Sequence, residues 1–353
     1  MIALLGRCDH PTDAVQDYCR CLAEALKARG FRLELESVNW PETGWLRSIR
    51  HLWRKTPSRQ WALVQYTALG WSRRGFPSLF LAVLLLLRLR KARLAVVFHD
   101  TEAYAGRRLV DSLRHACQLF VMRCAYRLAD ASILCVPLEG VSWLPEKPRK
   151  ASFIPIGANI PASVGLVESG HEVRTIAVFA ITDAGDISKE VSDIAFTAKA
   201  AAERVPHIRL VTLGRGSQEC EARFRQALAG SAVEYSALGL LPAIEVSRVL
   251  SSSDLALFVR GPISTRRGSA VASIACGVPL VAYAGPCLPA PLAEAGVVGV
   301  RDGDREALAG AAVRVLSDRQ LWAELHERSQ RAHQTYFSWE AVAGRFVEML
   351  NHA

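Results

Sequence analysis

The sequence predicts an α/β protein of two doubly wound domains, each with a parallel β-sheet covered by helices. Short apolar runs rich in Val, Ile and Leu alternate with longer helical stretches along the whole chain. This alternation is typical of βαβ units in a parallel sheet buried on both faces. The chain has 353 residues, 50% of them hydrophobic and 22% charged, which suffices for two cores of roughly 150 residues each.

The expected elements follow each other in a regular order. In the first half, strands are expected at 2–5, 33–37, 62–66, 94–98 and 132–136, with helices near 14–29, 44–54, 77–91 and 107–129. In the second half, strands are expected at 175–179, 209–213, 232–235, 255–259, 280–283 and 297–300, with helices near 188–204, 217–229, 243–252, 268–276 and 303–316. Two further helices, near 318–334 and 338–351, have no strand between them.

The boundary between the domains is expected between Asn159 and Glu172, because a polar stretch separates two regular strands there. We therefore expect an N-terminal domain over 1–165 and a C-terminal domain over 166–337. A last helix over 338–353 would suit a return to the first domain. Ligands bind at the carboxyl ends of strands in such sheets, so two facing domains would enclose a central cleft.

The net charge of +9 is distributed unevenly. Residues 1–150 hold 24 Lys and Arg against 13 Asp and Glu (+11), while residues 151–353 hold 19 against 21 (−2). A basic half favours nucleic acid, acidic ligands or anionic membrane surfaces as partners. The sequence contains no nucleic-acid-binding module, so we expect a membrane surface or an anionic substrate and no nucleic acid.

A basic amphipathic helix is expected within residues 45–55. Its Trp, Leu and Ile side chains share one broad face, and Arg47, Arg50 and Arg54 lie on another. This pattern is typical of helices at a membrane interface, although an ordinary helix packed on the sheet is the alternative. Further arginines up to residue 93 extend the basic region, so residues 45–93 are the expected membrane surface.

The remaining composition points to a cytoplasmic location, with peripheral attachment to the inner membrane face as an extension. The longest apolar run, 76–87, is too short to span a bilayer, and the first residues are too short for a signal peptide. The nine cysteines form no CxxC pair and fall mostly in apolar segments. Reduced buried thiols are therefore favoured over a disulfide framework or a zinc site.

The segment 260–283 carries the most informative pattern. It leaves an apolar strand through a loop with adjacent Arg266 and Arg267, opens a helix at Gly268, and returns to a strand through Cys-Gly-Val-Pro. Guanidinium groups and the N–H groups of a helix N-terminus bind a diphosphate, and Gly268 permits close approach. The alternative is that Arg266 and Arg267 are ordinary surface arginines that bind no ligand. The expected anion site comprises Arg260, Ser264, Arg266, Arg267, Gly268 and Ser269.

Two other loops of the second half add candidates for the same site. Lys189 lies at the start of a helix, where a cation opposes the helix dipole unless an anion is bound. A solvated lysine beside Glu190 is the alternative. Gly214 belongs to a Gly-Arg-Gly turn between strand and helix, which suits either a phosphate or simply a tight turn.

In the first half, Asp13, His99 and Asp100 follow predicted strands. Asp13 would contact a substrate from a helix start, although a role as N-cap, shared with Thr12, explains it equally. His99 ends a parallel strand, where its ring could hydrogen-bond a sugar hydroxyl or phosphate. A His capped by Asp100 without a ligand is the alternative. Asp100 could also serve as a general base.

Taken together, these segments resemble the GT-B glycosyltransferases, most closely the retaining family 4 group. The most specific match is Ala275-Cys-Gly-Val-Pro279. The resemblance covers nearly the whole chain and includes residues 11–15, 98–100, 154–159, the strand before Lys189, 251–258, 266–279 and 337–340. It implies two Rossmann-like domains.

The sequence departs from that family at three positions. The two acidic residues that family 4 carries near the donor sugar and the ribose correspond to Ser264 and Ala272, and an expected Arg corresponds to Ala184. We expect all three positions to lie in cleft-facing loops or on a polar helix face. Arg266 or Arg267 would supply the missing charge.

The resemblance implies a metal-independent enzyme that moves a sugar from a nucleotide diphosphate sugar to a glycan, polysaccharide or lipid-linked acceptor, without a cofactor. Lys189 and the anion site would neutralise the leaving diphosphate. His99 and Asp13 would orient the sugar or the acceptor. Two other classes stay open: an inactive GT-B-like binding subunit, suggested by Ser264 and Ala272, and a sugar-nucleotide epimerase of the same fold.

Overall fold

The computed structural model describes residues 1–7, 13–38, 43–56, 58–106, 108–162, 172–181 and 187–352. Its chain divides into two compact units, and the first is discontinuous in sequence. Met1–Pro155 and Trp339–Ala353 form the first unit, and Ile156–Ser338 forms the second. The domain boundary expected at residue 165 lies outside the described residues.

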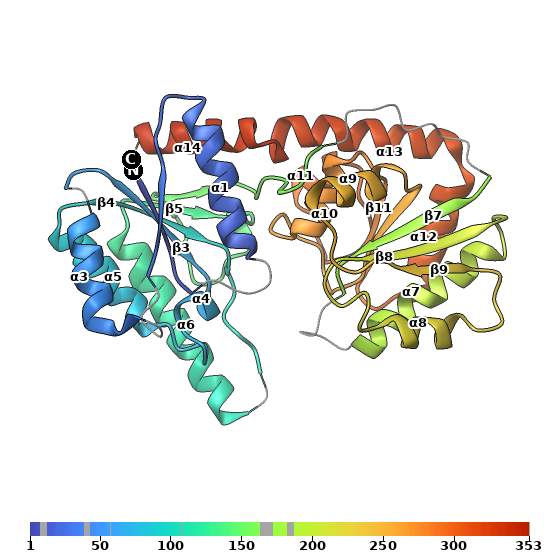
Figure 1. Cartoon of the computed structure of the whole chain (residues 1–353), viewed down its shortest axis with the longest axis horizontal. Helices are drawn as coiled ribbons and strands as arrows, with labels where there is room; N and C mark the ends of the chain where they lie inside the picture. Colours follow the sequence, from blue (N-terminus) through green and yellow to red (C-terminus); the bar gives the residue numbers. More distant parts are fainter. Residues whose placement is uncertain are drawn as a thin grey trace. The chain divides into compact units, whose positions relative to one another are not determined.

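The first unit is built on a six-stranded parallel sheet in the order β2-β1-β3-β4-β5-β6 (Figure 1). The strands are β1 Ile2–Leu5, β2 Glu34–Ser37, β3 Trp61–Tyr66, β4 Arg93–Phe98, β5 Ala131–Leu134 and β6 Ala151–Phe153. The helices are α1 Ala14–Lys27, α3 Trp45–Lys55, α4 Ala68–Trp71, α5 Ser78–Leu89, α6 Leu109–Leu128 and α14 Trp339–His352. Strand order reverses at β1, which pairs with β2 on one side and β3 on the other.

Helices cover both faces of this sheet. On one face α1 packs against β1 and β2, and α14 packs against α1; on the other, α5 and α6 pack on β4 and α3 packs on α5 (Figure 1). The inner strands β1, β3, β4 and β5 are buried because their side chains are largely apolar on both faces, whereas the edge strands β2 and β6 are partly exposed. Aromatic rings fill the core on the α5–α6 side, where Tyr66, Phe80 and Phe98 are in contact.

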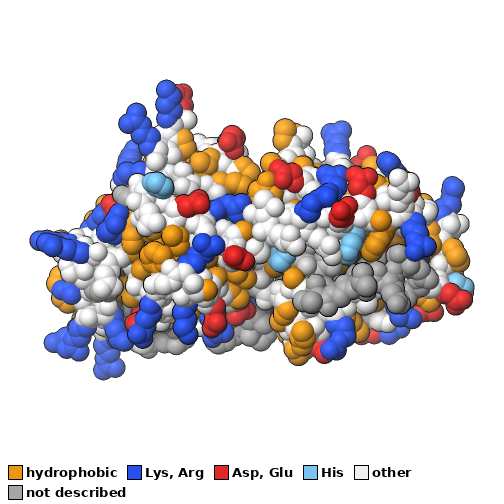
Figure 2. All heavy atoms as spheres, turned by 90° about the horizontal axis from the view of Figure 1, so that it is seen from above, with side chains coloured by type: hydrophobic (Ala, Val, Ile, Leu, Met, Phe, Trp, Pro, Cys, Tyr) orange, Lys and Arg blue, Asp and Glu red, His pale blue; other side chains and the backbone are white. Residues whose placement is uncertain are grey.

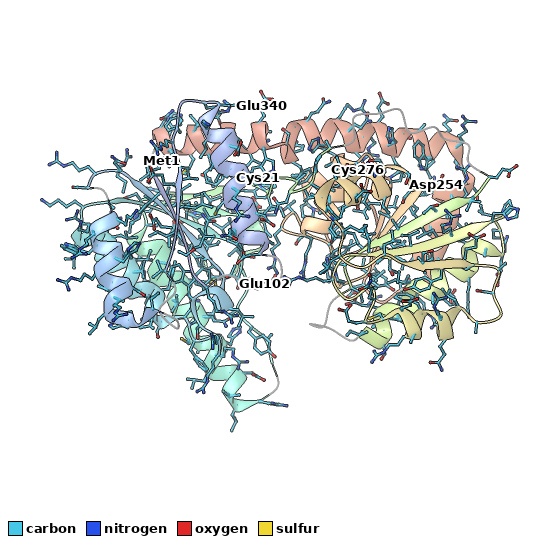
Figure 3. The ribbon with its side chains drawn as sticks, in the orientation of Figure 1. Met1, Cys21, Glu102, Asp254, Cys276 and Glu340 are labelled. Atoms are coloured by element: carbon cyan, nitrogen blue, oxygen red, sulfur yellow. The ribbon has the colours of Figure 1, made fainter. Side chains whose placement is uncertain are left out.

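The last helix, α14, is part of the first unit through its contacts with α1. The ring of Trp339 meets the buried ring of Tyr18 edge to face at 5.2 Å. Arg29, just beyond α1, donates a 3.2 Å hydrogen bond to the carbonyl of Glu340, which Figure 3 shows beside the end of α1. The apolar face of α1 is thus covered by residues more than 300 positions later in the chain.

The second unit repeats the architecture with a parallel sheet in the order β12-β11-β10-β7-β8-β9 (Figure 1). Its strands are β7 Arg174–Phe179, β8 Ile208–Leu213, β9 Glu234–Ala237, β10 Leu255–Phe258, β11 Leu280–Ala284 and β12 Val298–Arg301. Its helices are α7 Ile187–Ala202, α8 Glu221–Leu228, α9 Ala243–Ser251, α10 Gly268–Ala275, α11 Ala290–Glu294, α12 Arg305–Ser317 and α13 Arg319–Ala332. Strand order reverses between β7 and β10.

Buried polar groups join the elements of this second unit. Asp254, before β10, accepts a 2.7 Å bond from Arg174 and another from the Thr175 amide, while its carbonyl accepts from Trp322 of α13 (Figure 3). Cys276, at the end of α10, lies 3.8 Å from the Ser247 hydroxyl of α9. These contacts tie the start of β10 and the end of α10 to their neighbours.

The predicted fold class is confirmed: each unit is a doubly wound, Rossmann-like domain. The predicted strands and helices are present with small shifts, the largest at α8, which begins at Glu221 instead of near residue 217. Four short elements are absent from the expected ones, namely β6, α4, α11 and the 3-10 helix η1 Leu138–Gly140. None of the described helices is both long and apolar enough to cross a lipid bilayer.

Candidate anion site of the second unit

The loop between β10 and α10 lies at the carboxyl edge of the second sheet, where strand order reverses. Ligands of doubly wound proteins bind outside the sheet at such a reversal. The loop is fixed to the next strand because the Ile263 amide donates a 2.8 Å bond to the Tyr283 carbonyl. Beyond the loop and after α10, Gly277 has a positive φ of 70°, and a Cβ there would lie 2.8 Å from the ring of His326. Glycine is therefore required at the turn that follows α10.

Arg260 is the most deeply buried cation of this loop. Its guanidinium donates a 2.7 Å hydrogen bond to the hydroxyl of Ser269 and lies over the Phe258 ring at 5.1 Å. Burial and, to a smaller extent, the nearby charge of Arg267 together lower the pKa of Arg260 to about 10, although the carboxylate of Glu190 opposes the change. The group is still charged at neutral pH. An anion beside it would relieve the cost of keeping that charge out of water.

The residues between Arg260 and α10 form a turn that ends at the helix start. The Arg267 amide donates a 3.1 Å bond to the Ser264 carbonyl, and Gly268, which is exposed, begins α10. Within the described chain, the N-cap residue Arg267 makes no side-chain hydrogen bond to the first turn. The first turn of α10 therefore directly follows Arg266 and Arg267, and its N–H groups receive no side-chain cap from Arg267.

Lys189 contributes a second cationic group from the first turn of α7. Its ammonium lies 2.8 Å from a carboxylate oxygen of Asp193, one helical turn later, and 4.9 Å from the centre of the Tyr283 ring. The same Asp193 oxygen accepts a 2.9 Å bond from the Tyr283 hydroxyl. Half of the Lys189 side chain stays exposed, whereas only 7% of the Asp193 side chain is exposed. The Lys189 ammonium is thus paired with Asp193, while half of its side chain stays in solvent.

Asp193, Tyr283 and the buried Glu190 were not among the predicted site residues. Burial and the nearby Asp193 carboxylate raise the pKa of Tyr283, so its hydroxyl stays protonated and donates. The spacing of Lys189 and Asp193 by four residues is a recognisable helical pair. The burial of Glu190, by contrast, depends on how α7 packs on the sheet, and no local pattern reveals it.

Gly214 is explained by internal packing. Its φ is 81°, its amide donates a 2.7 Å bond to the Gly239 carbonyl, and a Cβ would lie 2.8 Å from Phe179. At Gly216 a Cβ would lie 2.1 Å from the Ile181 carbonyl oxygen. A tight turn packed against the end of β7 requires both glycines, and the Gly214 amide is already used.

His99 ends β4 in the first unit and is surrounded by side chains. Its Nε2 lies 2.9 Å from the side-chain oxygen of Gln65, its Nδ1 lies 3.9 Å from the Cys135 sulfur, and the Tyr18 ring meets it edge to face. These contacts orient the imidazole at the carboxyl edge of the first sheet. Gln65 and Cys135 contact the two ring nitrogens, and the role expected of His99 toward a substrate stays a prediction.

The two candidate carboxylates of the first unit, Asp13 and Asp100, accept hydrogen bonds from backbone amides. Asp13 is the N-cap of α1 and accepts 2.9 Å bonds from the amides of Val15 and Gln16. Asp100 accepts a 2.8 Å bond from the amide of Ala68 and so secures the start of α4. The capping role considered for Asp13 is therefore present in the structure, while Thr12 lies outside the described residues.

One expectation about the missing family acids is wrong. Ala272 was expected on a polar helix face, but it lies on the inner side of α10 and is 2% exposed. Ser264 lies in the loop before α10 and is partly exposed. Ala184 lies outside the described residues.

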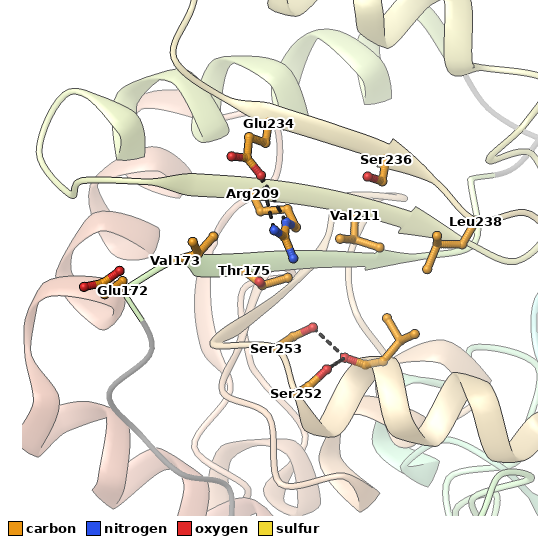
Figure 4. Close-up of a pocket in the computed structure, with 11 residues that line it drawn as sticks. Glu172, Val173, Thr175, Arg209, Val211, Glu234, Ser236, Leu238, Ser252 and Ser253 are labelled. Atoms are coloured by element: carbon orange, nitrogen blue, oxygen red, sulfur yellow. Dashed lines mark hydrogen bonds and ion pairs between the residues drawn. The ribbon is translucent and has the colours of Figure 1, made fainter.

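A separate cavity of about 740 Å³ lies on the face of β7, β8 and β9 (Figure 4). Arg209 and Glu234 point toward each other across it at 3.3 Å, and the hydroxyls of Ser252 and Ser253 bond to a carbonyl of α9. None of the expected site residues lines this cavity. Its single cation, Arg209, is paired with Glu234, so we do not assign the donor site to it.

Neither metal ligands nor disulfides are evident in the described part of the chain. No group of three or more His, Cys, Asp or Glu side chains lies close enough there to hold a metal ion. The eight described cysteines are all free thiols, and burial raises the pKa of Cys19 and Cys117. These thiols are protonated at neutral pH.

The two Rossmann-like units give the chain the GT-B fold of glycosyltransferases, as its similarity to solved structures shows. Anabaena Alr3699/HepE, solved with UDP and glucose, is similar at a TM-score of 0.68 and 14% identity over 100% of this chain and 99% of that chain. Sucrose-phosphate synthase of Thermosynechococcus elongatus is similar at 0.71 and 17% identity, over 99% and 98%. A putative UDP-N-acetylglucosamine 2-epimerase of Listeria monocytogenes is similar at 0.62 and 13% identity, over 99% and 95%.

Sequence comparisons find no relative, in contrast to the structural comparison. No protein-family model matches the chain, and no curated protein matches it. The low identities mean that the fold is shared while most side chains differ. The assignment of residues to roles therefore depends on the geometry of this chain.

Proposed function

We propose that the protein is a glycosyltransferase that moves a sugar from a nucleotide diphosphate sugar to a glycan, polysaccharide or lipid-linked acceptor. The observation that carries the proposal is the gathering of Arg260, Arg266 and Arg267 in the loop that leads into the N-terminus of α10. Arg260 and Arg267 are close enough for the charge of Arg267 to lower the pKa of Arg260. A diphosphate would relieve that repulsion and accept hydrogen bonds from the first turn of α10. The glucose nucleotide of HepE provides a precedent for the donor.

In this proposal the cations stabilise the leaving diphosphate as negative charge develops on it. Fixed guanidinium and ammonium groups lower the free energy of such a transition state without a metal ion. Lys189 and Arg266 would reach the phosphates from α7 and from the loop, and Arg260 would act from its buried position. Ser269 shares its hydroxyl with Arg260, and Gly268 gives the phosphate a close approach to the backbone.

His99 is the group of the first unit that we assign to the sugar or the acceptor. Its ring is fixed by Gln65 and Cys135 at the end of β4, which suits a hydrogen bond of defined direction. Asp13 and Asp100 would support substrate contacts mainly by holding the starts of α1 and α4.

Removing the paired arginines tests the phosphate assignment. The double variant Arg266→Ala with Arg267→Ala should weaken binding of UDP or another nucleoside diphosphate by on the order of 2–4 kcal/mol, about 30- to 1000-fold, because two charge-assisted contacts are lost. Titration calorimetry with UDP, GDP, dTDP and ADP, and with their sugars, measures the effect and identifies the base.

The matched control removes two exposed arginines of α8, with Arg223→Ala and Arg225→Ala, and should leave nucleotide affinity unchanged. Equal affinity of the Arg266/Arg267 variant and the unaltered protein would remove the basis of the proposal. A protein that binds no nucleoside diphosphate would instead support a binding subunit with another ligand.

An epimerase is the second candidate, because one of the similar structures is a putative UDP-N-acetylglucosamine 2-epimerase. Such an enzyme converts the sugar nucleotide without an acceptor. Incubation with the donor alone separates the two activities, since an epimerase accumulates an isomeric sugar nucleotide and a transferase at most releases free sugar and nucleoside diphosphate.

We further propose that the first unit attaches to an anionic membrane surface from the cytoplasmic side. Helix α3 leaves Leu46 79% exposed and Trp53 43% exposed, and Arg90 stacks over the Trp53 ring at 5.0 Å. A helix packed on the sheet in the ordinary way would bury those side chains. Figure 2 shows Lys and Arg side chains projecting around the edge of this unit. Exposed aromatic and aliphatic groups beside arginines are typical of an interfacial helix.

A further inference from the structure

A cavity of about 390 Å³ lies in the first unit at the carboxyl end of β1. Its walls come from Arg7 after β1, Val38 after β2, helix α4, and the segment 72–79 that leads into the first turn of α5. This is the place where strand order in the first sheet reverses, so it is where a doubly wound domain receives a ligand. All of the lining residues belong to the first unit.

Three arginines, Arg7, Arg73 and Arg74, give the cavity its charge. No Asp or Glu occurs among the described residues that line it. None of the ion pairs formed between described residues involves these arginines, and in that part of the chain the buried Nε of Arg7 has no hydrogen-bond partner. Three guanidinium groups around one cavity repel each other and attract an anion.

The rest of the lining is apolar. Trp71 and Val38 are buried at the base, and Phe76 is partly buried. Leu69 and Leu79 lie at the opening, and Leu69 is 59% exposed. A ligand that fits this lining has an anionic group for the arginines and a hydrocarbon part that covers the two leucines.

The cavity is held open by hydrogen bonds from both sides. On the β1 side, the Arg7 amide donates a 2.7 Å bond to the Gly70 carbonyl. A Cβ at Gly6 would lie 2.2 Å from that carbonyl oxygen, so only glycine permits this close approach. Asp100 holds the other end of α4 through the Ala68 amide.

Helix α6 fixes the opposite rim. Gln118 donates a 2.9 Å bond to the Gly75 carbonyl, and Arg114 donates a 3.0 Å bond to the Arg74 carbonyl. Since the backbone is held by these bonds, the side chains of Arg73 and Arg74 project from a fixed segment. A preformed cavity loses little conformational entropy when it binds a ligand.

We infer that this cavity binds the phosphate group and the first carbons of an amphiphilic acceptor. The inference rests on the proposed function and narrows it to a phosphorylated lipid among the acceptors considered there. The phosphate would contact Arg7, Arg73 and Arg74, and the hydrocarbon chain would leave along Leu69 and Leu79. A cavity of this volume holds a headgroup and a short length of chain, while the remainder would stay outside.

Decyl phosphate, used below its micelle concentration, is the probe for this site. Titration calorimetry should show binding of decyl phosphate at least about tenfold tighter than binding of inorganic phosphate or of decyl maltoside, because each of those compounds satisfies only one half of the site. Comparable binding of the neutral maltoside, or no binding of decyl phosphate, would overturn the inference.

Two substitutions then locate the site. Arg73→Ala with Arg74→Ala should weaken decyl phosphate binding at least about tenfold, since two charge-assisted contacts are removed from exposed side chains. Leu69→Gln should weaken binding of decyl phosphate but not of inorganic phosphate. Arg47→Ala with Arg50→Ala on α3 is the matched control and should change neither. Unaltered decyl phosphate affinity in the Arg73/Arg74 variant would place the ligand elsewhere.

The same titrations separate this inference from the proposed function. UDP binding to the second unit should be equal in the Arg73/Arg74 variant and in the unaltered protein. A protein that binds UDP but not decyl phosphate would refute the acceptor site alone. A protein that binds decyl phosphate but no nucleoside diphosphate would refute the proposed donor.

Discussion

Asp193 illustrates how one buried carboxylate organises several side chains. It accepts the Tyr283 hydroxyl and pairs with Lys189, although its own side chain is almost completely buried. A buried hydrogen bond to a charged acceptor contributes more than one at the surface, because water does not compete for it. The position of Lys189 therefore depends on a hydrogen bond made by β11.

Replacing Tyr283 with Phe should lower the free energy of unfolding by about 1–2 kcal/mol, since Asp193 loses a hydrogen bond while staying buried. Urea denaturation measures the change. Tyr336→Phe is the control, because Tyr336 also donates to a carboxylate, that of Glu294, but at an exposed site. Its effect should stay within about 0.5 kcal/mol. Equal losses in the two variants would show that burial does not strengthen the Tyr283 bond.

At the scale of single residues, the sequence singled out the cationic groups, whose role in anion binding stays a prediction, but it did not reveal their partners. Arg260, Arg267 and Lys189 could be found because cations at helix starts and beside Gly-Ser are unusual in a local pattern. The partners could not be found in the same way. Glu190 is close to Arg260, and Ala272 is buried, only because of the way distant helices pack.

Among the elements, the C-terminal end of α5 is joined to its neighbours by one ion pair. Arg88 of α5 makes two hydrogen bonds of 2.9 Å to Asp130 and also bonds to the Leu128 carbonyl at the end of α6. Asp130 in turn accepts a bond from the Leu94 amide of β4. Partial burial would raise the pKa of Asp130, but the Arg88 and Leu94 hydrogen bonds and nearby positive charges outweigh it and lower that pKa below 3.8.

Asp130→Asn should cost about 1 kcal/mol of unfolding free energy at pH 7, a modest value because 31% of the carboxylate side chain is exposed. A carboxyl whose pKa is lowered on folding stabilises the native state above its unfolded pKa, and that contribution is lost as the pH falls through the lower folded pKa. The difference between the two proteins should therefore shrink below about pH 4. Thermal unfolding between pH 3 and pH 7 measures it; a difference that stays constant over this range would contradict the assignment.

At the same scale, long periodic elements were predictable and short ones were not. Helices such as α6 and α7 carry enough turns for their apolar spacing to be recognised. β6 has three residues, α4 has four, and α11 has five with a proline inside, so none of them repeats a period often enough. α4 nevertheless forms a wall of the cavity in the first unit. The sequence therefore did not predict the helix that forms one wall of this cavity.

For the molecule as a whole, the uneven charge predicts a salt-dependent association with anionic vesicles. Binding to vesicles with anionic lipid should exceed binding to neutral vesicles at low salt, and should fall as ionic strength rises, because exposed charges are screened. Cosedimentation with vesicles measures this. Arg47→Ala with Arg50→Ala should weaken vesicle binding by about 2 kcal/mol, or about 30-fold at low salt, since each exposed arginine near the surface contributes about 1 kcal/mol.

The Arg223→Ala with Arg225→Ala double variant of α8 serves as the charge control for that experiment. It removes the same charge from an exposed helix of the second unit and leaves the exposed face of α3 intact. An equal loss of vesicle binding in both variants would show that net charge, and not α3, causes attachment. Binding that does not depend on salt would contradict an electrostatic attachment altogether.

The contact between α14 and α1 has a consequence for biosynthesis. The first unit reaches Pro155, but the helix that covers Tyr18 begins only at Trp339. A ribosome adding 5–20 residues per second needs about 10–40 s to translate the intervening segment. During that interval the second unit emerges while the apolar side of α1 is still uncovered. The nascent chain therefore offers chaperones a transient binding surface in its oldest part, and the first unit to be started is the last to be completed.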